Sequence, residues 1–309
     1  MSAETKPAVV VGSINMDLVA NASHIPVGGE TVLGNNFQIH PGGKGANQAV
    51  AISRLGYPVH MIGRVGNDAF GTQLRRQLEE DRVNTACVTT TNGSSGVATI
   101  IVAENGENCI VISAGANALL SPDDLDRNID IIRSAGIVLT QLETPLETVQ
   151  HLARICTQEK IPLMLDPAPA QSMPRSLLEA VTWLTPNETE AAFLVGENPA
   201  RDPAQTAEML MHHGAQGVVL KLGSRGAYLK SPSQREATIA AFPVRAVDTT
   251  AAGDTFNGAF AVGVMLGKTP ESSAQFAAAA AALSVTRHGA QPSMPSRAEV
   301  DLLLGAAKG

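Results

Sequence analysis

The chain has 309 residues, of which 44% are hydrophobic and 17% charged, so it can bury a substantial core. Its formal net charge is −7, from 22 basic and 29 acidic residues, and it contains no basic block. A nucleic-acid backbone attracts a positive surface, and only 3% of the residues are aromatic and able to stack on bases. We therefore expect no nucleic-acid partner.

The chain shows no sign of a membrane or secretory segment. No apolar run reaches about 18 residues, and no signal-peptide core precedes the first apolar segment. The three cysteines, Cys87, Cys109 and Cys156, are far apart, which argues against a disulfide framework or a structural zinc site. We expect them to be small buried hydrophobic residues, in a soluble protein of the cytoplasm.

Short apolar runs alternate with segments of helical spacing along the chain. The runs predict strands at residues 9–11, 59–62, 137–142, 163–165, 218–222, 226–230 and 237–241. The spacing predicts helices at residues 45–55, 71–80, 125–133, 148–158, 203–213, 253–266, 272–286 and 296–304. This alternation predicts an α/β fold with a central, mostly parallel sheet sandwiched by helices.

Two stretches, residues 16–40 and 95–113, interrupt this alternation. The second contains Asn105-Gly106 between two β-rich runs, which is a strong signal for a hairpin. We interpret both stretches as strands of a small, separate β-sheet lid within a single domain spanning residues 1–309.

A glycine-rich segment at residues 41–48, Pro-Gly-Gly-Lys-Gly-Ala-Asn-Gln, opens one of the expected helices. Glycines let backbone amides approach a ligand, and the start of a helix carries a partial positive charge. A tight turn is the alternative interpretation. Asn15 and Asp17 follow the first strand, so they would share the ligand-binding edge of the sheet with Lys44 and Asn47. These side chains suit a polyhydroxylated ligand.

A second segment, residues 248–259, carries the stronger signal. Ala251, Ala252 and Gly253 leave the start of a helix sterically bare, so the amides there can form an anion hole. Asp254 falls in the first turn, where we expect the helix N-terminus to keep it ionised. An ordinary helix cap is the alternative. A carboxylate beside an anion hole is the arrangement that phosphoryl transfer needs.

These segments resemble a known family. GGKGANQA and DTTAAGDTFNGAF match the two signatures of the ribokinase-like (phosphofructokinase-B) sugar kinases. The segments VGSINMD, QLETP, DPAPA, TPNETEA, KLGSRGAY and TRHGAQPSMPS are similar to the family in the same order, over nearly the whole chain. The resemblance implies a three-layer α/β fold with a β-lid that forms a homodimer interface. It also implies transfer of the γ-phosphoryl group of ATP to the 5-hydroxyl of D-ribose, with Mg²⁺ and an activating K⁺.

The resemblance further implies roles for individual residues. The implied sugar contacts are Asn15, Asp17, Gly43, Lys44, Asn47, Glu143 and Asp254. Asp254 is the implied catalytic base, and the implied anion hole consists of the amides of Ala251, Ala252, Gly253 and Asp254. The implied ATP contacts are Asn187, Lys221, Gly223, Ser224, Gly226 and Gly253. Asn187 and Glu190 are implied to hold Mg²⁺ through water, and the implied K⁺ site consists of Asp248, Thr250, Ser284, Arg287, Gly289 and Ser293.

Simpler interpretations of three of these elements remain open. Glu143 is otherwise a surface carboxylate in a loop, Asn187 and Glu190 a solvated first turn of a helix, and residues 221–226 a hairpin turn. Other functions also remain open: a kinase for deoxyribose or adenosine, and a non-catalytic sugar sensor. Adenosine calls for stacking groups that are scarce near Asn15 and Asn47, whereas deoxyribose would leave polar groups there unpaired. A sensor could dispense with Asp254.

Overall fold

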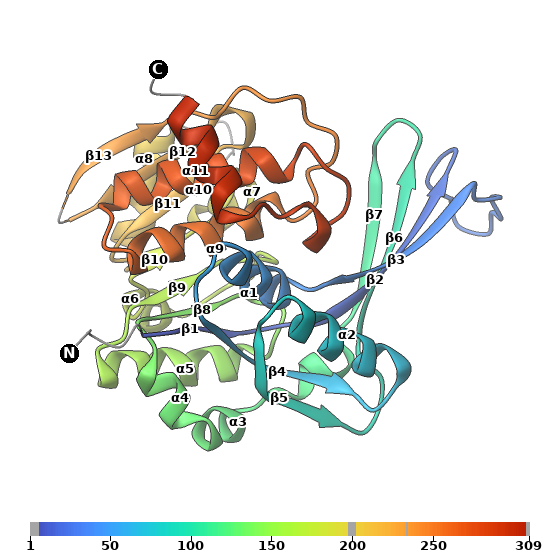
Figure 1. Ribbon diagram of the computed structural model, residues 1–309, viewed down its shortest axis with the longest axis horizontal. Helices are drawn as coiled ribbons and strands as arrows, with labels where there is room; N and C mark the ends of the chain where they lie inside the picture. Colours follow the sequence, from blue (N-terminus) through green and yellow to red (C-terminus); the bar gives the residue numbers. More distant parts are fainter. Residues whose placement is uncertain (1–5, 197–201, 233, 307–309) are drawn as a thin grey trace.

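The computed structural model describes residues 6–196, 202–232 and 234–306 of the chain. These residues form a nine-stranded sheet and a separate four-stranded sheet (Figure 1). Helices cover both faces of the larger sheet, whereas the smaller sheet extends away from it. The predicted α/β architecture is therefore confirmed.

The nine-stranded sheet has the order β13-β12-β11-β10-β9-β8-β1-β4-β5. Its strands are β1 (Ala8–Val11), β4 (Val59–Gly66), β5 (Asn84–Thr91), β8 (Ile137–Thr140), β9 (Leu163–Leu165), β10 (Trp183–Leu184), β11 (Val218–Lys221), β12 (Ala227–Ser231) and β13 (Gln234–Ile239). The strands from β5 to β11 pair in parallel, and β12 and β13 are antiparallel. The sequence did not predict β5, which is rich in threonine and lies at the edge, or β10, which has two residues.

Two hydrophobic cores fill the space between this sheet and its helices. Ala8 and Val10 of β1 point into one core, and Val9 and Val11 point into the other. The first core is covered by α1 (Lys44–Arg54), α2 (Ala69–Glu80), α9 (Ala252–Met265), α10 (Pro270–Ser284) and α11 (Arg297–Ala306). The second is covered by α3 (Pro122–Arg127), α4 (Ile129–Ser134), α5 (Leu146–Glu159), α6 (Arg175–Glu179), α7 (Glu188–Val195) and α8 (Pro203–His212). Strands buried on both faces explain the continuous apolar runs of the sequence.

The single helix predicted at residues 125–133 is wrong, because the structure has two short helices there. The backbone leaves the helical conformation at Asn128, which has φ −109° and ψ 20°. The Asn128 side chain donates a hydrogen bond to the Asp124 carbonyl oxygen at 2.8 Å. An asparagine amide that bonds nearby backbone competes with the helical pattern, so the helix ends at this residue.

The four-stranded sheet has the order β3-β2-β6-β7. Its strands are β2 (Asn15–Ala22), β3 (Asn36–Gly42), β6 (Gly96–Ala103) and β7 (Asn108–Ser113). The Asn105-Gly106 turn joins β6 to β7 as predicted, with Gly106 at φ +86°. Asn15 and Asp17 belong to β2, so they reach the site from this second sheet; the predicted strand stretch at residues 16–40 began one residue after Asn15.

The cysteine prediction holds for two of the three residues. Cys87 and Cys156 are buried, but Cys109 is exposed on β7, and all three are free thiols. Among the described residues, no helix is long and apolar enough to cross a membrane.

Glycine allows α1 to pack directly against the chain between β1 and β2. A Cβ atom on Gly45 would lie 2.7 Å from the Ser13 nitrogen and 2.8 Å from the Gly12 carbonyl carbon. Gly43, the N-cap of α1, has φ +89°, a conformation that other residues rarely adopt. The contact between α1 and this part of the chain therefore depends on the absence of side chains.

We predict that Gly45→Ala lowers the free energy of unfolding by about 1–3 kcal/mol, because its methyl group would overlap fixed backbone atoms. Urea denaturation measures the change. Gly305→Ala is the control, since a Cβ atom at this helical position meets nothing within 4 Å. Equal stability of the two variants would contradict the close packing described here.

Candidate active site

The first turn of α9 presents backbone amides without acceptors. The amides of Ala251, Gly253 and Asp254 have no hydrogen-bond acceptor among the described residues, whereas that of Ala252 donates to the Thr249 carbonyl oxygen at 3.2 Å. Ala251 is the N-cap and adopts φ +58°, which is uncommon for a residue with a side chain. These small residues leave an accessible group of donors at the positive end of a helix, which suits an anion.

The first turn of α1 is different, because the amides of Lys44, Gly45 and Ala46 already have acceptors within the protein. The amide of Lys44 donates to Glu143 Oε2 at 3.2 Å. The amides of Gly45 and Ala46 donate to Ser13, at 3.4 Å to its Oγ and 2.9 Å to its carbonyl oxygen. Gly45 serves the close packing of α1 against Ser13, and these three amides are not open to a ligand.

Asp254 lies buried at the start of α9, between two amide side chains of α1. Asn47 Nδ2 donates to Asp254 Oδ2 at 2.9 Å, and Gln48 Nε2 donates to Oδ1 at 3.2 Å. Burial raises the pKa of Asp254 to about 6, against the opposing effect of Lys44. Desolvation outweighs the groups that favour the ionised form, so this pKa lies above that of an exposed aspartate. At neutral pH this carboxyl group is mostly ionised and more basic than an exposed aspartate.

Two further carboxylates and a lysine share this environment. Burial, with the charges of Glu143 and Asp254, raises the pKa of Asp17 to about 7. Burial alone would lower the pKa of Lys44, but nearby carboxylates outweigh it and raise that pKa above its usual range. Ser13 Oγ donates to Glu143 Oε2 at 2.5 Å, which fixes this carboxylate beside α1. Glu143 is therefore not a free carboxylate on the surface. The Lys44 ammonium group interacts with the carboxylates of Asp254 and Glu143.

Asn15 is held by Asn117, a residue that the sequence analysis missed. Asn117 lies in the short 3₁₀ helix Gly115–Leu119, and its Nδ2 donates to Asn15 Oδ1 at 2.7 Å. Its side chain also bonds the backbone nitrogen and oxygen of Ile14. It thus fixes the start of β2, and no motif around Asn117 signals this contact.

Asp166 is a second residue that the analysis missed. It follows β9, and its Oδ1 accepts from Lys221 Nζ at 3.0 Å while its Oδ2 accepts from Gln48 Nε2 at 3.1 Å. A carboxylate directly after a buried parallel strand, at the edge that also carries Glu143, is a usable signal. Its ion pair places the Lys221 ammonium near the first turn of α9, where a Cβ atom on Gly253 would lie 3.4 Å from Nζ.

Asn187 and Glu190 form the N-terminal cap of α7. Asn187 Oδ1 accepts from the Glu190 amide, and Glu190 Oε2 accepts from the Asn187 amide, both at 2.8 Å. This reciprocal pair matches the helix-start alternative. Burial raises the pKa of Glu190, while Lys221 lowers it. In the described part of the chain, no group of three or more His, Cys, Asp or Glu side chains is placed to hold a metal ion directly.

The segment after β11 is a hairpin turn, as the simpler interpretation has it. Ser224 lies in the 3₁₀ turn Gly223–Arg225, which leads into β12. Gly223 and Gly226 have φ +57° and +90°. A Cβ atom on Gly226 would lie 1.9 Å from the carbonyl oxygen of Ile239, the last residue of β13. Only glycine therefore fits at this position.

The six residues predicted for K⁺ lie on two segments, residues 248–250 and 284–293. The Asp248 side chain connects these segments through hydrogen bonds. Asp248 Oδ1 accepts from the Thr250 amide at 2.9 Å, and Oδ2 accepts from the Gly289 amide at 2.8 Å. Ser284 and Ser293 donate to the carbonyl oxygens of Ala281 and Ala290, at 2.9 Å and 2.7 Å. The Arg287 side chain forms an ion pair with Glu299; because a guanidinium group is cationic and carries no oxygen, only the Arg287 backbone carbonyl could act as a ligand.

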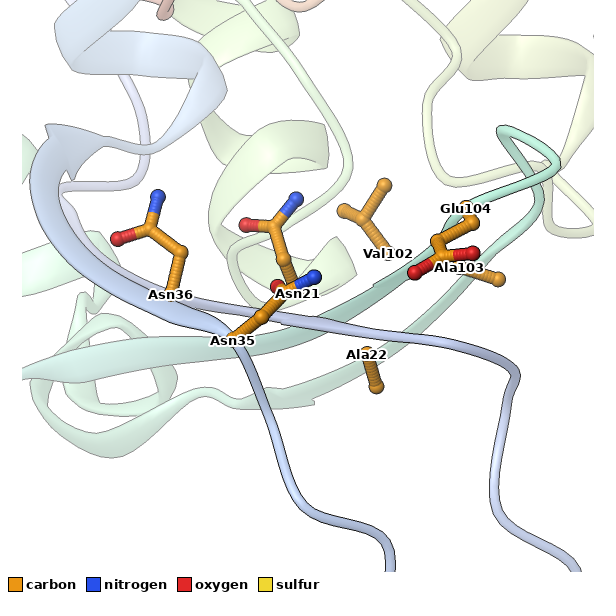
Figure 2. Close-up of a pocket in the computed structure, with 7 residues that line it drawn as sticks. All are labelled: Asn21, Ala22, Asn35, Asn36, Val102, Ala103 and Glu104. Atoms are coloured by element: carbon orange, nitrogen blue, oxygen red, sulfur yellow. The ribbon is translucent and has the colours of Figure 1, made fainter.

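A hollow of about 130 Å³ lies at the outer end of the second sheet (Figure 2). It is lined by Asn21, Ala22, Asn35, Asn36, Val102, Ala103 and Glu104. None of the predicted site residues is among them. The polar residues around Asp254 gather instead at the other end of β2, where this strand begins.

Comparison with known proteins places the chain in a family. The family described as pfkB family carbohydrate kinase matches residues 5–297. The chain belongs to this family. This membership confirms the predicted family of sugar kinases.

Relatives with known names agree with this assignment. A ribokinase of Bacillus subtilis is 43% identical, over 96% of this chain and 98% of its own length. A deoxyribokinase of Salmonella typhi is 38% identical, over 93% of this chain and 95% of its own length. A solved structure of Arabidopsis thaliana ribokinase, complexed with ribose and ATP, superposes with a TM-score of 0.89 at 37% identity, over 97% of this chain and 99% of that one.

We predict that Asp17→Asn stabilises the fold at pH 8 but has little effect at pH 4. The pKa of Asp17 is raised from 3.8 to about 7 on folding, so ionising it costs stability progressively between about pH 4 and pH 7. The expected gain is on the order of 1–4 kcal/mol. Urea denaturation at both pH values measures it, with the exposed Asp130→Asn as control. A gain at pH 4 as large as that at pH 8 would contradict this explanation.

Proposed function

We propose that this protein transfers the γ-phosphoryl group of ATP to the 5-hydroxyl of D-ribose, with Asp254 as the general base. The observation that carries the proposal is the position of Asp254. Its carboxylate is buried in the helical turn where the amides of Ala251, Gly253 and Asp254 lack acceptors. A base and an anion-binding group thus lie side by side, as an in-line phosphoryl transfer requires.

The sugar hydroxyls bind among acceptors and donors that the fold holds in place. Asn15, Asp17 and Asn47 offer side-chain groups, Glu143 is anchored by Ser13, and Gly43 lets the backbone approach. Asp254 accepts the proton of the reacting hydroxyl as the oxygen attacks the phosphorus atom. Because its pKa is about 6, it is both ionised at neutral pH and basic enough to take this proton.

The transferred phosphoryl group lies at the first turn of α9, where the amides of Ala251, Gly253 and Asp254 stabilise its charge. The Lys221 ammonium adds a positive charge beside Gly253. The turn at residues 223–226 supports the nucleotide, with Ser224 and the Asn187 cap as further contacts. ADP leaves once the phosphoryl group has moved to the sugar.

The residues present fit the two cations that the family resemblance implies. Glu190 faces Lys221 and is partly desolvated, so its carboxylate, with Asn187, suits the water shell of Mg²⁺. When bound, this ion supplies charge neutralisation for the phosphates. The K⁺ site would use oxygen atoms of Asp248, Thr250, Ser284, Gly289 and Ser293 and the backbone of Arg287. The donors are all oxygen, as a hard cation requires.

The second sheet serves as a lid and as a dimer interface in this proposal. Phe37 and Ile39 of β3 and Val111 of β7 are 59%, 44% and 61% exposed. The strand register puts all three on one face of this sheet, opposite to Asp17. One face therefore carries a sugar contact and the other an apolar surface for a second copy. A cytoplasmic location, where ATP is available, fits such a kinase.

Deoxyribose remains the strongest competing substrate, because a named deoxyribokinase is among the relatives. The buried acceptors around Asn15 and Asp17 favour a sugar that carries its full set of hydroxyls, since an unpaired buried acceptor costs about 1–3 kcal/mol. An assay of ADP release with ribose, deoxyribose, fructose and adenosine distinguishes the candidates. The proposal requires ribose to give the highest kcat/KM.

We predict that Asp254→Asn keeps ribose and ATP binding but lowers kcat by roughly 10²–10⁴-fold, the range for a lost general base. Calorimetry measures binding, and the ADP-release assay measures turnover. Asp301→Asn, which changes a surface ion pair with Arg297, is the control. Near-native turnover of the Asp254 variant would remove this residue from the mechanism.

We also predict that Phe37→Asp combined with Val111→Asp converts a dimer into monomers, because it places charge in the apolar face. Analytical ultracentrifugation measures the mass. Leu302→Asp, at a position on α11 that is 75% exposed, should leave the dimer intact. A dimer that survives the double substitution would place the interface elsewhere.

A further inference from the structure

Each carboxylate oxygen of Asp254 accepts a hydrogen bond from a different amide side chain of α1. Asn47 holds Oδ2, and Gln48 holds Oδ1. Asn47 and Gln48 are consecutive residues of the helix, and both are buried. The base is thus held on both sides by one helical segment.

An amide group has a donor end and an acceptor end, so either end of Asn47 or Gln48 could face Asp254. A second layer of amides decides which end does. Gln291 Nε2 donates to Asn47 Oδ1 at 3.2 Å. Gln141 Nε2 donates to Gln48 Oε1 at 2.8 Å. Because the outer glutamines occupy the inner carbonyl oxygens, they favour the orientation in which the inner NH₂ groups point at the carboxylate. For Gln48 the Asp166 carboxylate, which accepts from the same Nε2 at 3.1 Å, favours this orientation as well.

The two outer glutamines share an unusual feature. Gln141 Oε1 and Gln291 Oε1 are buried and have no hydrogen-bond partner among the described residues. A buried carbonyl oxygen without a partner opposes folding, so packing alone gives no reason for glutamine at these two positions. Gly12 makes room for one of them, because a Cβ atom there would lie 2.1 Å from Gln141 Oε1.

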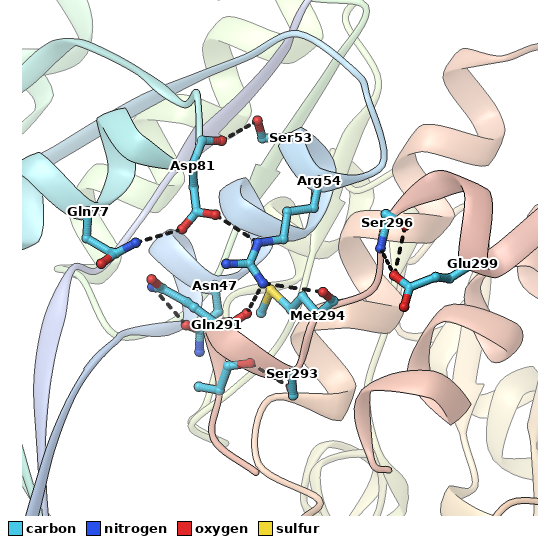
Figure 3. Close-up of polar contacts among 11 residues, drawn as sticks. Asn47, Ser53, Arg54, Gln77, Asp81, Gln291, Ser293, Met294, Ser296 and Glu299 are labelled. Atoms are coloured by element: carbon cyan, nitrogen blue, oxygen red, sulfur yellow. Dashed lines mark hydrogen bonds and ion pairs between the residues drawn. The ribbon is translucent and has the colours of Figure 1, made fainter. Parts of the chain in front are cut away.

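The two outer glutamines come from different parts of the fold. Gln141 follows β8 at the edge of the main sheet, and Gln291 begins a 3₁₀ turn that precedes α11. Figure 3 shows how this turn is fixed: Arg54 of α1 donates to the carbonyl oxygens of Gln291 and Met294 while its guanidinium binds Asp81. Gln141 is therefore anchored at the end of β8, and Gln291 in a turn that Arg54 holds through backbone hydrogen bonds.

We propose that Gln141 and Gln291 are positioning residues for Asp254, which act through Gln48 and Asn47 by fixing the donor ends of both amides toward the base. This inference rests on the proposed function of Asp254. Neither glutamine touches the sugar or the nucleotide. Each prevents the inner amide from turning over and presenting its oxygen to the carboxylate.

The charged groups that face Asp254 come from four elements. They are Lys44 of α1, Lys221 of β11, Asp166 after β9 and Asp17 of β2. The outer glutamines add no charge to this set. Replacing one of them by methionine therefore leaves every charge in place and changes only the orientation of an amide.

The test is to replace each outer glutamine by methionine, which is similar in size and has no amide. An inner amide that turns over brings its oxygen to Asp254 and favours the protonated acid. We expect the acidic limb of the pH profile of kcat to move up by about one pH unit in each variant, and kcat at neutral pH to fall roughly tenfold. KM for ribose should rise only in Gln291→Met, because Asn47 is a proposed sugar contact and Gln48 is not.

Gln77→Met is the matched control. Gln77 is a half-buried glutamine that donates to another aspartate, Asp81, at 3.2 Å. This variant should leave the pH profile unchanged. Circular dichroism establishes that each variant is folded, and Gly12→Ala, which displaces Gln141 without replacing it, should reproduce the shift of Gln141→Met.

The titration of Asp254 can also be followed without turnover. In protein labelled with ¹³C at the aspartate carboxyl carbons, the resonance absent from Asp254→Asn is that of Asp254. Its midpoint should move up in both methionine variants, even if the wild-type protein phosphorylates a different sugar. Failure to act on ribose would overturn the proposed function only. An unmoved midpoint, or a fall in stability with an unchanged pH profile, would overturn the positioning role.

Discussion

A carboxylate buried at the start of α9 is the feature on which the rest of this structure depends. Taking Asp254 out of water raises its pKa, so the folded protein must stabilise the ionised form by other means. It does so with the charges of Lys44 and Lys221 and with the amide hydrogen bonds from Asn47 and Gln48. These groups favour the ionised form, which the proposed general base must have to accept a proton.

The two sheets meet around this carboxylate. The main sheet contributes Asp166 and Glu143 from the ends of its strands, and the second sheet contributes Asp17 from β2. Gly42 shows how close the approach is, since a Cβ atom there would lie 2.1 Å from Asp17 Oδ2. The acids are held together against their mutual repulsion by backbone geometry and by Lys44. A cluster of this kind is unfavourable for folding but binds hydroxyl groups and cations well.

The sequence predicted those parts of the fold and site that depend on local patterns. Apolar runs and helical spacing located most of the main sheet and its helices, and Asn105-Gly106 located the hairpin of the second sheet. The bare start of α9 was predicted from Ala251, Ala252 and Gly253. These features need only neighbouring residues, so a single sequence is sufficient to find them.

Contacts between segments that are distant in the sequence could not be predicted from local patterns. Asn117 reaches Asn15 across 102 positions, and Gln48 reaches Asp166 across 118. The sequence likewise could not show that the amides of Lys44, Gly45 and Ala46 are occupied, because their acceptors belong to Ser13 and Glu143. The raised pKa of Asp254 could not be predicted for the same reason, since its burial depends on segments that are distant in the sequence.

The arrangement of charge also explains why the site divides into two ends. Lys44 lies among the carboxylates of Asp17, Glu143 and Asp254, so acceptors dominate that end and favour a neutral, hydroxyl-rich molecule. Lys221 and the amides without acceptors lie at the other end, where donors dominate and an anion is stabilised. Asp254 belongs to both ends: its side chain faces the acids and its amide faces the anion. In the proposed reaction, the sugar hydroxyl and the phosphoryl group therefore meet at this one residue.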